Sequence, residues 1–206
     1  PLLPIPLGTA NLMGRHLGIH WNRRQAPGQV IAALRRMRIK QMDAALANDQ
    51  LCLLMAHVGF DAHVVHELAL ARHGPIRYAS YVRPTLTALA KYSAPFLTVR
   101  VDGQNIFEQQ GMAFVANIPE YGTGFPLLPH AEGDDGLLDV CCVPCRNRLD
   151  VIKFFLSAAG DTHTASAGTI SLRGRHVRID SVPPALVQID GDPAGSTPLD
   201  VRRLPF

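Results

Sequence analysis

Apolar and polar residues alternate with a period of two over much of the second half of the chain, which is typical of β-strands with one buried face. Residues 96–101 lead into Asp102-Gly103, a dipeptide favoured in tight hairpin turns, and 104–109 return from it. Further strands are predicted at 112–118, 137–143, 169–172, 176–180, 185–189 and 200–204, with turns at 122–124, 173–175 and 183–184. Many short strands at this spacing indicate a β-sandwich or a barrel.

Helical patterns precede and interrupt this strand series. Residues 61–91 carry apolar side chains at helical spacing, and breaks at Gly74-Pro75 and Pro84 predict two or three helices there. A further helix is expected over 147–159, because Asn147 is a favourable N-cap and the apolar residues after it share one face. The combination predicts an α+β fold.

The first residues of the chain follow another pattern. An apolar run at 2–7 ends at Gly8-Thr9, and a stretch with helical character follows at 10–18, which predicts a strand, a tight turn and a helix. Beyond it the pattern predicts one short helix and two strands, at 27–34, 35–42 and 51–58. Asn48-Asp49 provides a hairpin turn between the two strands. Because the first residues already resemble a protein core, we expect the chain to begin inside a domain.

Composition indicates a folded protein, and charge adds a clue to its partners. With 206 residues, 47% of them hydrophobic and 18% charged, the chain can bury a core, and its apolar runs fall short of the roughly 20 residues that span a bilayer. The four cysteines, three of them within 141–145, fit reduced thiols of a soluble intracellular protein. Residues 1–42 contain seven Lys or Arg and no Asp or Glu. This segment indicates an anionic neighbour, such as nucleotide phosphate, a lipid headgroup or nucleic acid, or else a solvated basic face.

Three short motifs are candidates for chemistry. The turn at 6–11 joins small residues, a Thr hydroxyl and an Asn amide to a helix start, which suits phosphate contact; a structural cap is the alternative. The turn at 133–140 holds Asp134 and Asp135, oxygen ligands suited to Mg²⁺ or Ca²⁺, or else an acidic hairpin without metal. Asp190-Gly191-Asp192 follows a strand, where one carboxylate could take a proton from an attacking hydroxyl; a simple turn is the alternative.

Other catalytic signatures are missing from the sequence. It has no Gly-x-Ser-x-Gly elbow, no GK[ST] phosphate loop and no complete dinucleotide-binding fingerprint. Aromatic residues make up 6% of the chain and do not alternate with basic ones, which argues against a nucleic-acid platform.

Taken in order, these motifs resemble the diacylglycerol kinase catalytic-domain family, which holds bacterial diacylglycerol and phospholipid kinases and sphingosine kinase-like enzymes. Residues 6–11 are similar to the family's PLGTAN segment, and 59–62 to its GFDA segment. Residues 134–140 resemble DDGLLDV, and 187–193 resemble VQIDGEP. The resemblance spans essentially the whole chain.

This resemblance implies two domains with the active site between them. Residues 1–40 would be the C-terminal remnant of an α/β nucleotide-binding domain, truncated at its N-terminus. Residues 41–206 would form a β-rich, sandwich-like domain with helices, whose last strand could return to the first domain. The family's glycine-rich GGDGT nucleotide loop lies upstream of PLGTAN and outside this chain, so we expect the chain alone to be inactive.

The resemblance also implies roles for individual residues. The catalytic pair would be Asp192, as general base toward the lipid hydroxyl, and Asp190, which supports it. The nucleotide would be held by Gly8, Thr9, Asn11 and Asp43. A Mg²⁺ ion would be held by the carboxylate of Asp135 and the backbone carbonyls of Glu132 and Leu137. The chain departs from the family at Leu12, where many bacterial members have Asp, and at Asp192, which replaces a longer Glu.

The expected function is therefore that of an ATP- and Mg²⁺-dependent kinase for a lipid hydroxyl, either diacylglycerol-like or sphingoid. Such a protein would be cytoplasmic and peripheral to the membrane, with a membrane lipid and ATP as partners, no nucleic acid, and a homodimer left open. One alternative is a non-catalytic lipid- or nucleotide-binding member of the same fold. Another is a related kinase that acts on a soluble nucleotide such as NAD.

Overall fold

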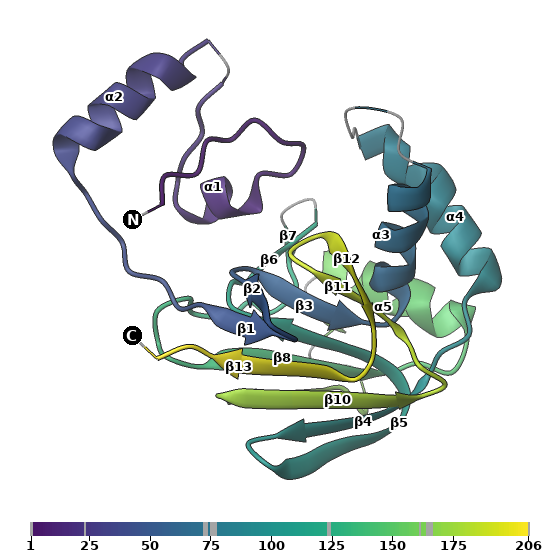
Figure 1. Cartoon of the computed structure of the whole chain (residues 1–206). Coiled ribbons are helices and arrows are strands. Elements are labelled where there is room, and N and C mark those ends of the chain that lie inside the picture. Colours follow the sequence, from purple (N-terminus) through teal and green to yellow (C-terminus); the bar gives the residue numbers. More distant parts are fainter. Residues whose placement is uncertain are drawn as a thin grey trace.

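The sheet of the molecule is a single curled surface that folds over into two layers. A computed structural model describes residues 2–22, 24–71, 74, 78–122, 125–160, 162–163 and 167–205. Within these residues, eleven antiparallel strands form this sheet (Figure 1). Both layers share the long strand β5 (Gln104–Ala116), whose first half pairs with one layer and whose second half pairs with the other. The expected sandwich-like fold is confirmed.

The outer layer contains five further strands, in spatial order β2 (Gln50–Cys52), β1 (Ala45–Ala47), β13 (Leu199–Arg203), β10 (His176–Val182) and β4 (Phe96–Val101). The inner layer, which lies between the outer layer and the helices, contains β12 (Asp192–Ser196), β11 (Leu186–Ile189), β3 (Met55–Val58), β8 (Leu138–Pro144) and β9 (Ile170–Gly174). In the inner layer, β5 lies between β3 and β8.

The crossing of β5 from one layer to the other requires a glycine. The strand pairs with β4 up to Gln110 and with β8 from Gly111 onward. A Cβ atom at Gly111 would lie 2.4 Å from the carbonyl oxygen of Val143 and 2.7 Å from the ring of Phe107. Only a residue without a side chain lets the backbones approach this closely.

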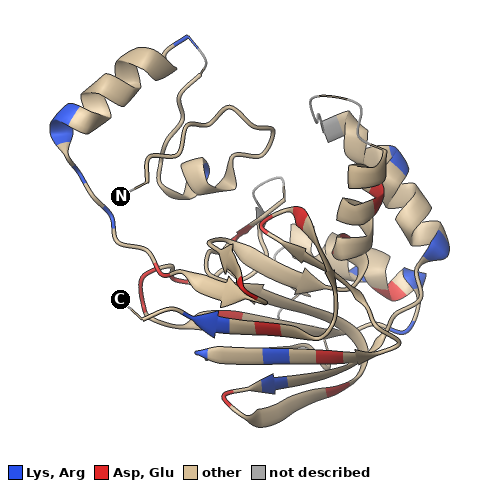
Figure 2. Ribbon diagram, viewed as in Figure 1, with Lys and Arg blue, Asp and Glu red and all other residues tan. Residues whose placement is uncertain are grey.

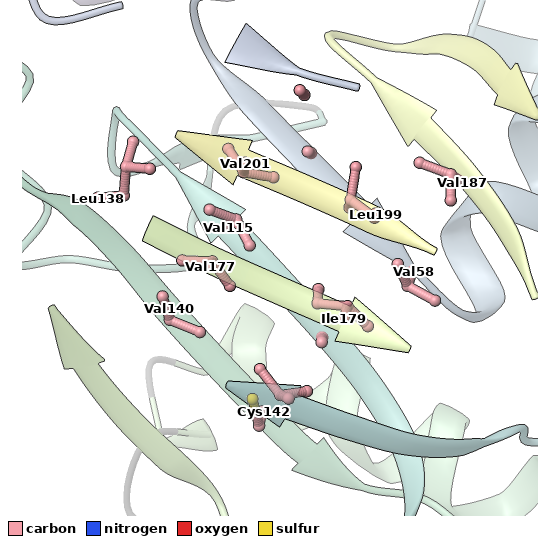
Figure 3. Close-up of a cluster of buried hydrophobic side chains, with 14 of the residues drawn as sticks. Val58, Val115, Leu138, Val140, Cys142, Val177, Ile179, Val187, Leu199 and Val201 are labelled. Carbon is pink, nitrogen blue, oxygen red and sulfur yellow. The ribbon is translucent and has the colours of Figure 1, made fainter. Parts of the chain in front are cut away.

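The inner layer buries both faces, and alternate residues of its strands enter different cores. Val58, Val115 and Val140 point into the core between the two layers, which Figure 3 shows. Residues of opposite parity, such as Met55 and Phe114, enter a second core beneath the helices. This strict alternation follows from the period of two along a strand.

Three helices cover the face of the inner layer that points away from the outer layer. They are α3 (Phe60–Leu70), α4 (Val82–Lys91) and α5 (Arg148–Ala159), and the short 3₁₀ helix η1 (Tyr78–Tyr81) precedes α4. The helix α5 begins as expected, because the side chain of Asn147 accepts hydrogen bonds from the backbone N–H groups of Leu149 and Asp150. A two-stranded sheet, β6 (Glu120–Tyr121) and β7 (Phe125–Pro126), completes this side.

The N-terminal segment, residues 2–44, lies beside the open end of the sandwich (Figure 1). It contains α1 (Leu12–His16) and α2 (Ala26–Arg36). One of its contacts with the remainder is the pair His16 Nδ1–Glu120 Oε2 at 3.1 Å, which joins α1 to β6. The assignment of residues 1–40 to a separate domain stays a prediction.

Several predicted elements are wrong, and most lie near the N-terminus. Residues 2–7 form no strand, and 38–44 are irregular although 35–42 was expected as a strand. The predicted strand 51–58 is two strands, because the backbone at Leu53-Leu54 leaves the sheet to bond to a side chain described below. Apolarity alone does not reveal such a break, since all these residues are suited to a strand.

Other differences concern the ends of elements. Pro84 does not break a helix but lies in the first turn of α4, where the missing N–H costs nothing. The strands predicted at 104–109 and 112–118 form one strand, and β12 was missed because its residues are mostly exposed and lack an apolar alternation. The turn expected at 173–175 is shorter, since β9 continues to Gly174. Pro75 and the turn residues 123–124 lie outside the described residues.

Candidate functional site

A cavity of about 790 Å³ opens between the N-terminal segment, the three covering helices and the end of the β11–β12 hairpin. Most of its wall is apolar, formed by Leu12, Leu54, Met55, Phe60, Val64, Val65, Leu89, Val151, Ile152, Phe155 and Leu156. Its polar lining residues are Thr9, Asn11, Asp61, Tyr81, Thr85, Glu120, Tyr121, Gln188 and Asp190. A large, mostly apolar cavity with a few polar groups is the usual form of a ligand site.

The turn of the N-terminal motif forms one side of this cavity. The backbone N–H of Gly8 donates to Asn11 Oδ1 at 2.7 Å, and Asn11 Nδ2 donates back to the Gly8 carbonyl at 2.8 Å. Asn11 has a left-handed backbone with φ 52°, which this residue type tolerates. Asn11 therefore uses its amide to close the turn, and the closed turn presents Thr9 to the cavity.

Asp190 supports the opposite side of the cavity through its carboxylate. Oδ2 accepts a hydrogen bond from the Leu53 N–H at 2.8 Å, and Oδ1 accepts from the Leu54 and Met55 N–H groups, both at 2.9 Å. Leu53 and Leu54 lie in the break between β2 and β3, and Met55 is the first residue of β3. Asp190 thus positions that backbone, and its left-handed φ of 51° turns the chain into Gly191.

Asp192 is the first residue of β12 and is exposed. It does not line the cavity, and its carboxylate has no hydrogen-bond partner among the described residues. Gln188, which sequence reasoning missed, is buried, lines the cavity and accepts the Gly191 N–H at 2.8 Å through Oε1. A buried Gln in an otherwise apolar strand was the signal that could have identified it.

Asp43 is fully buried and lies outside the cavity lining. Its Oδ2 accepts the Gly136 N–H at 2.7 Å, and its Oδ1 pairs with Arg203 Nε at 3.1 Å. The side chain of Asn117 donates both to the Asp43 carbonyl at 2.7 Å and to the Leu53 carbonyl at 3.0 Å. Since Leu53 also donates to Asp190, Asp43 and Asp190 belong to one hydrogen-bonded network at this end of the sandwich.

The acidic turn at Asp135 contains its own cation. Arg173, on β9, pairs through Nη1 with Asp135 Oδ2 and through Nε with Asp139 Oδ1, both at 3.2 Å, and donates through Nη2 to the His130 carbonyl. The other Asp135 oxygen accepts the Leu137 N–H at 2.9 Å. Each oxygen of Asp135 has one partner, and a Mg²⁺ ion at this turn would compete with Arg173 for the carboxylate. Among the described residues, no group of three or more His, Cys, Asp or Glu has the arrangement of a metal site.

A polar cluster to which the sequence analysis assigned no role includes two residues of the cavity wall, Asp61 and Tyr121, and the buried His57. Asp61, in the first turn of α3, hydrogen-bonds with the Tyr121 side chain, and its Oδ2 lies 3.8 Å from Nδ1 of His57. Burial raises the pKa of Asp61 to about 6, partly offset by the Tyr121 hydrogen bond. Burial lowers the pKa of His57 to about 3, so its ring, which stacks on Phe114 at 4.0 Å, is neutral.

The surface around the site carries an uneven charge. In Figure 2, the helices α1 and α2 carry basic but no acidic residues, and the basic ones lie in their last turns.

Among the described residues, none of the helices combines the length and the apolar character needed to cross a bilayer.

Comparison with known proteins finds relatives that are similar over the whole length of this chain. The uncharacterised protein sll0036 of Synechocystis sp. is 27% identical over the whole chain, which spans 48% of that protein. A protein of Mycobacterium tuberculosis named diacylglycerol kinase is 24% identical over the whole chain, which spans 67% of it. The chain thus covers about half to two thirds of these relatives.

Solved structures share the fold. The crystal structure of a diacylglycerol kinase from Bacillus anthracis str. Sterne superposes with a TM-score of 0.67 at 23% identity, over 96% of this chain and 63% of that one. Residues 55–206 match the family described as the YegS C-terminal NAD kinase beta sandwich-like domain. Because this match takes in most of the chain and both layers of the sandwich, the protein belongs to that diacylglycerol kinase-like family.

Proposed function

We propose that this chain is part of an ATP- and Mg²⁺-dependent lipid kinase, which transfers a phosphoryl group to the hydroxyl of a diacylglycerol-like or sphingoid lipid. The observation that carries the proposal is the mostly apolar cavity of about 790 Å³, with the Gly8-Thr9 turn on one side and the Asp190-Gly191 hairpin on another. A soluble nucleotide acceptor would not need an apolar wall of this extent. Buried alkyl chain, by contrast, gains about 0.8 kcal/mol per CH₂ group.

In this proposal the alkyl part of the lipid occupies the space between α3, α4 and α5, and its hydroxyl lies near the β11–β12 hairpin. The exposed carboxylate of Asp192 takes the proton as the hydroxyl oxygen attacks the γ-phosphorus, and ADP leaves. The carboxylate of Asp190 is engaged by three backbone donors, so its contribution is to hold the hairpin in place. Thr9 contacts the phosphates, next to the turn that Gly8 and Asn11 close.

Mg²⁺ enters this scheme with the nucleotide, where it neutralises charge on the phosphates. The basic segment ahead of β1 supports two roles in the same proposal. Its seven Lys and Arg residues would attract both the nucleotide and an anionic cytoplasmic membrane surface, which is where the lipid substrate is found. Each role predicts binding that weakens as salt is added, because exposed charges are screened.

The test is phosphoryl transfer from γ-labelled ATP to lipid in mixed micelles, with the natural full-length protein. We expect Mg²⁺-dependent labelling of the lipid, and a loss of several orders of magnitude in kcat for Asp192→Asn with unchanged thermal stability. Asp192→Glu, which restores the longer side chain common in the family, is the matched control and should keep activity.

Three outcomes would contradict the proposal or its mechanism. Lipid binding without any transfer, in the full-length protein, would support a non-catalytic lipid-binding member. ATP consumption with NAD as acceptor and none with lipid would support a nucleotide kinase instead. Full activity of Asp192→Asn would remove this residue from the mechanism.

A further inference from the structure

One side chain of the cavity wall is an amide, and only half of it is bonded. Gln188, on β11, lines the cavity and is 3% exposed. Its Oε1 atom accepts the backbone N–H of Gly191 at 2.8 Å, across the turn of the β11–β12 hairpin. Because a backbone N–H can only donate, this bond identifies the atom at the turn as the amide oxygen, and the Nε2 amino group is the free branch of the amide.

The strand places this side chain on the face that lies beneath the helices. Val187 and Ile189, its neighbours on β11, belong to the core between the two layers. Gln188 has the opposite parity and pairs across the strands with His57, whose ring stacks on Phe114 of the second core. The side chain therefore extends toward the cavity and not into the sandwich.

The Nε2 amino group of Gln188 has no hydrogen-bond partner within the described part of the chain. It is not among the polar atoms that are sealed from solvent, so the surface that it keeps opens onto the cavity. The hairpin turn needs only an acceptor, which explains the oxygen of this amide but not its amino group. Since a nearly buried donor without an acceptor is unfavourable for folding, the free amino group argues for an acceptor on a ligand.

The charges around this amide favour a neutral acceptor. Asp190 and Asp192 flank Gly191 at the end of the hairpin, and residues 186–196 include no Lys or Arg. An anionic phosphate oxygen at this point would be repelled by the two carboxylates. A carbonyl oxygen carries no net charge and accepts hydrogen bonds well, so it suits this position.

We propose that the Nε2 group of Gln188 donates a hydrogen bond to an acyl carbonyl of the lipid, so that the cavity selects an acylated alcohol over its ether analogue. The carbonyl, of an ester or an amide, lies beside the hydroxyl that receives the phosphoryl group, because Gln188 and Asp192 belong to the same hairpin. Gln188 is then a specificity-determining residue. This inference rests on the proposed function, because it assumes that the cavity takes an alkyl chain.

The test compares two ligands that differ by one carbonyl group, 1-O-dodecanoylglycerol and 1-O-dodecylglycerol. Their binding to the natural full-length protein is measured by isothermal titration calorimetry below their aggregation concentrations. We expect the ester to bind about fivefold more tightly than the ether, the effect of one hydrogen bond between neutral groups. The ether is the more apolar ligand, so burial of apolar surface alone would favour it instead.

Two variants then locate the effect. Gln188→Glu keeps an oxygen for the Gly191 N–H and replaces the donor by a second acceptor, so the ester should bind no more tightly than the ether. Gln104→Glu, the same substitution at an exposed position at the start of β5, should keep the full preference. Thermal unfolding checks that each variant is folded, and the comparison in the unmodified protein tests the inference even if Gln188→Glu does not fold.

The outcomes separate this inference from the proposed function. Equal binding of the two ligands to the unmodified protein, or a preference that survives Gln188→Glu, overturns the role of Gln188 and leaves the lipid cavity in place. A Gln188→Glu variant that loses affinity for ATP and keeps the lipid preference overturns it as well, because the amide then serves the nucleotide. Failure of both ligands to bind overturns both proposals, because the cavity then does not accept an alkyl chain.

Discussion

Asp190 offers a way to separate a structural carboxylate from a chemical one. Its two oxygens accept the N–H groups of Leu53, Leu54 and Met55 at 2.8–2.9 Å. In Asp190→Asn, one of the two oxygens becomes an NH₂ group, which cannot accept and faces a donor. Asn tolerates the left-handed backbone at this position, so the substitution tests hydrogen bonding rather than strain.

The size of the effect follows from these contacts. A hydrogen bond to a charged group contributes about 1.5–3 kcal/mol, and a buried donor without a partner is penalised by about 1–3 kcal/mol. In the variant, one oxygen no longer accepts a hydrogen bond and the other no longer carries a negative charge. Together, these two losses predict a destabilisation of about 3 kcal/mol. For a domain of this size that corresponds to a fall in Tm of roughly 6–12 °C.

The assay is urea unfolding followed by far-UV circular dichroism, with Asp192→Asn as the matched control. Asp192 is exposed and has no partner among the described residues, so its variant should unfold within about 0.5 kcal/mol of the unmodified protein. If Asp190→Asn is equally stable, the three backbone contacts do not hold the break between β2 and β3, and the reasoning is refuted.

Three further predictions concern other parts of the fold. Arg173→Met should lower the free energy of unfolding by about 1–2 kcal/mol, because Asp135 and Asp139 lose their basic partner. Millimolar Mg²⁺ should raise the Tm of this variant but not that of the unmodified protein. An equal rise in both would show that Mg²⁺ reaches Asp135 despite the arginine. Gly111→Ala should destabilise by about 3 kcal/mol in chemical unfolding, because its Cβ meets backbone at 2.4 Å, whereas Gly28→Ala has open space and should cause no loss. Burial raises the pKa of Asp61 from 3.8 to about 6, so the protonated carboxyl group stabilises the fold fully below pH 4, and this stabilisation is lost as the pH rises to about 6. The free energy of unfolding should fall by about 3 kcal/mol over this range in the unmodified protein and not in Asp61→Asn. Identical pH profiles of the two proteins would contradict this prediction.

The sequence alone was enough to predict most of the sandwich. Alternation of apolar residues identified outer-layer strands such as β4 and β10, short apolar runs identified β8 and β11, and the Asp102-Gly103 turn identified the β4–β5 hairpin. These signals are local, since an exposed and a buried face are visible within a few residues. The helix after Asn147 was predicted for the same reason, because its cap and its apolar face lie within one segment.

Near the N-terminus local signals were misleading. The apolar residues at 2–7 and 35–42 suit a strand, but a strand also needs a partner, and no partner strand lies beside them in the described structure. The break at Leu53-Leu54 was equally invisible, because the acceptor that stabilises it is Asp190, 137 residues away from Leu53.

The candidate site depended still more on tertiary structure. The sequence motifs identified Thr9, Asn11 and Asp190, which do line one cavity, and Asp43, which joins Asp190 through hydrogen bonds of Asn117. Neither composition nor spacing revealed that Arg173 neutralises the acidic turn, or that Asp61 opens into an apolar space. The sequence determines which faces and turns are favourable, because these depend on neighbouring residues. Which carboxylates are engaged and which are available is decided by partners brought from distant strands, and therefore only by the tertiary structure.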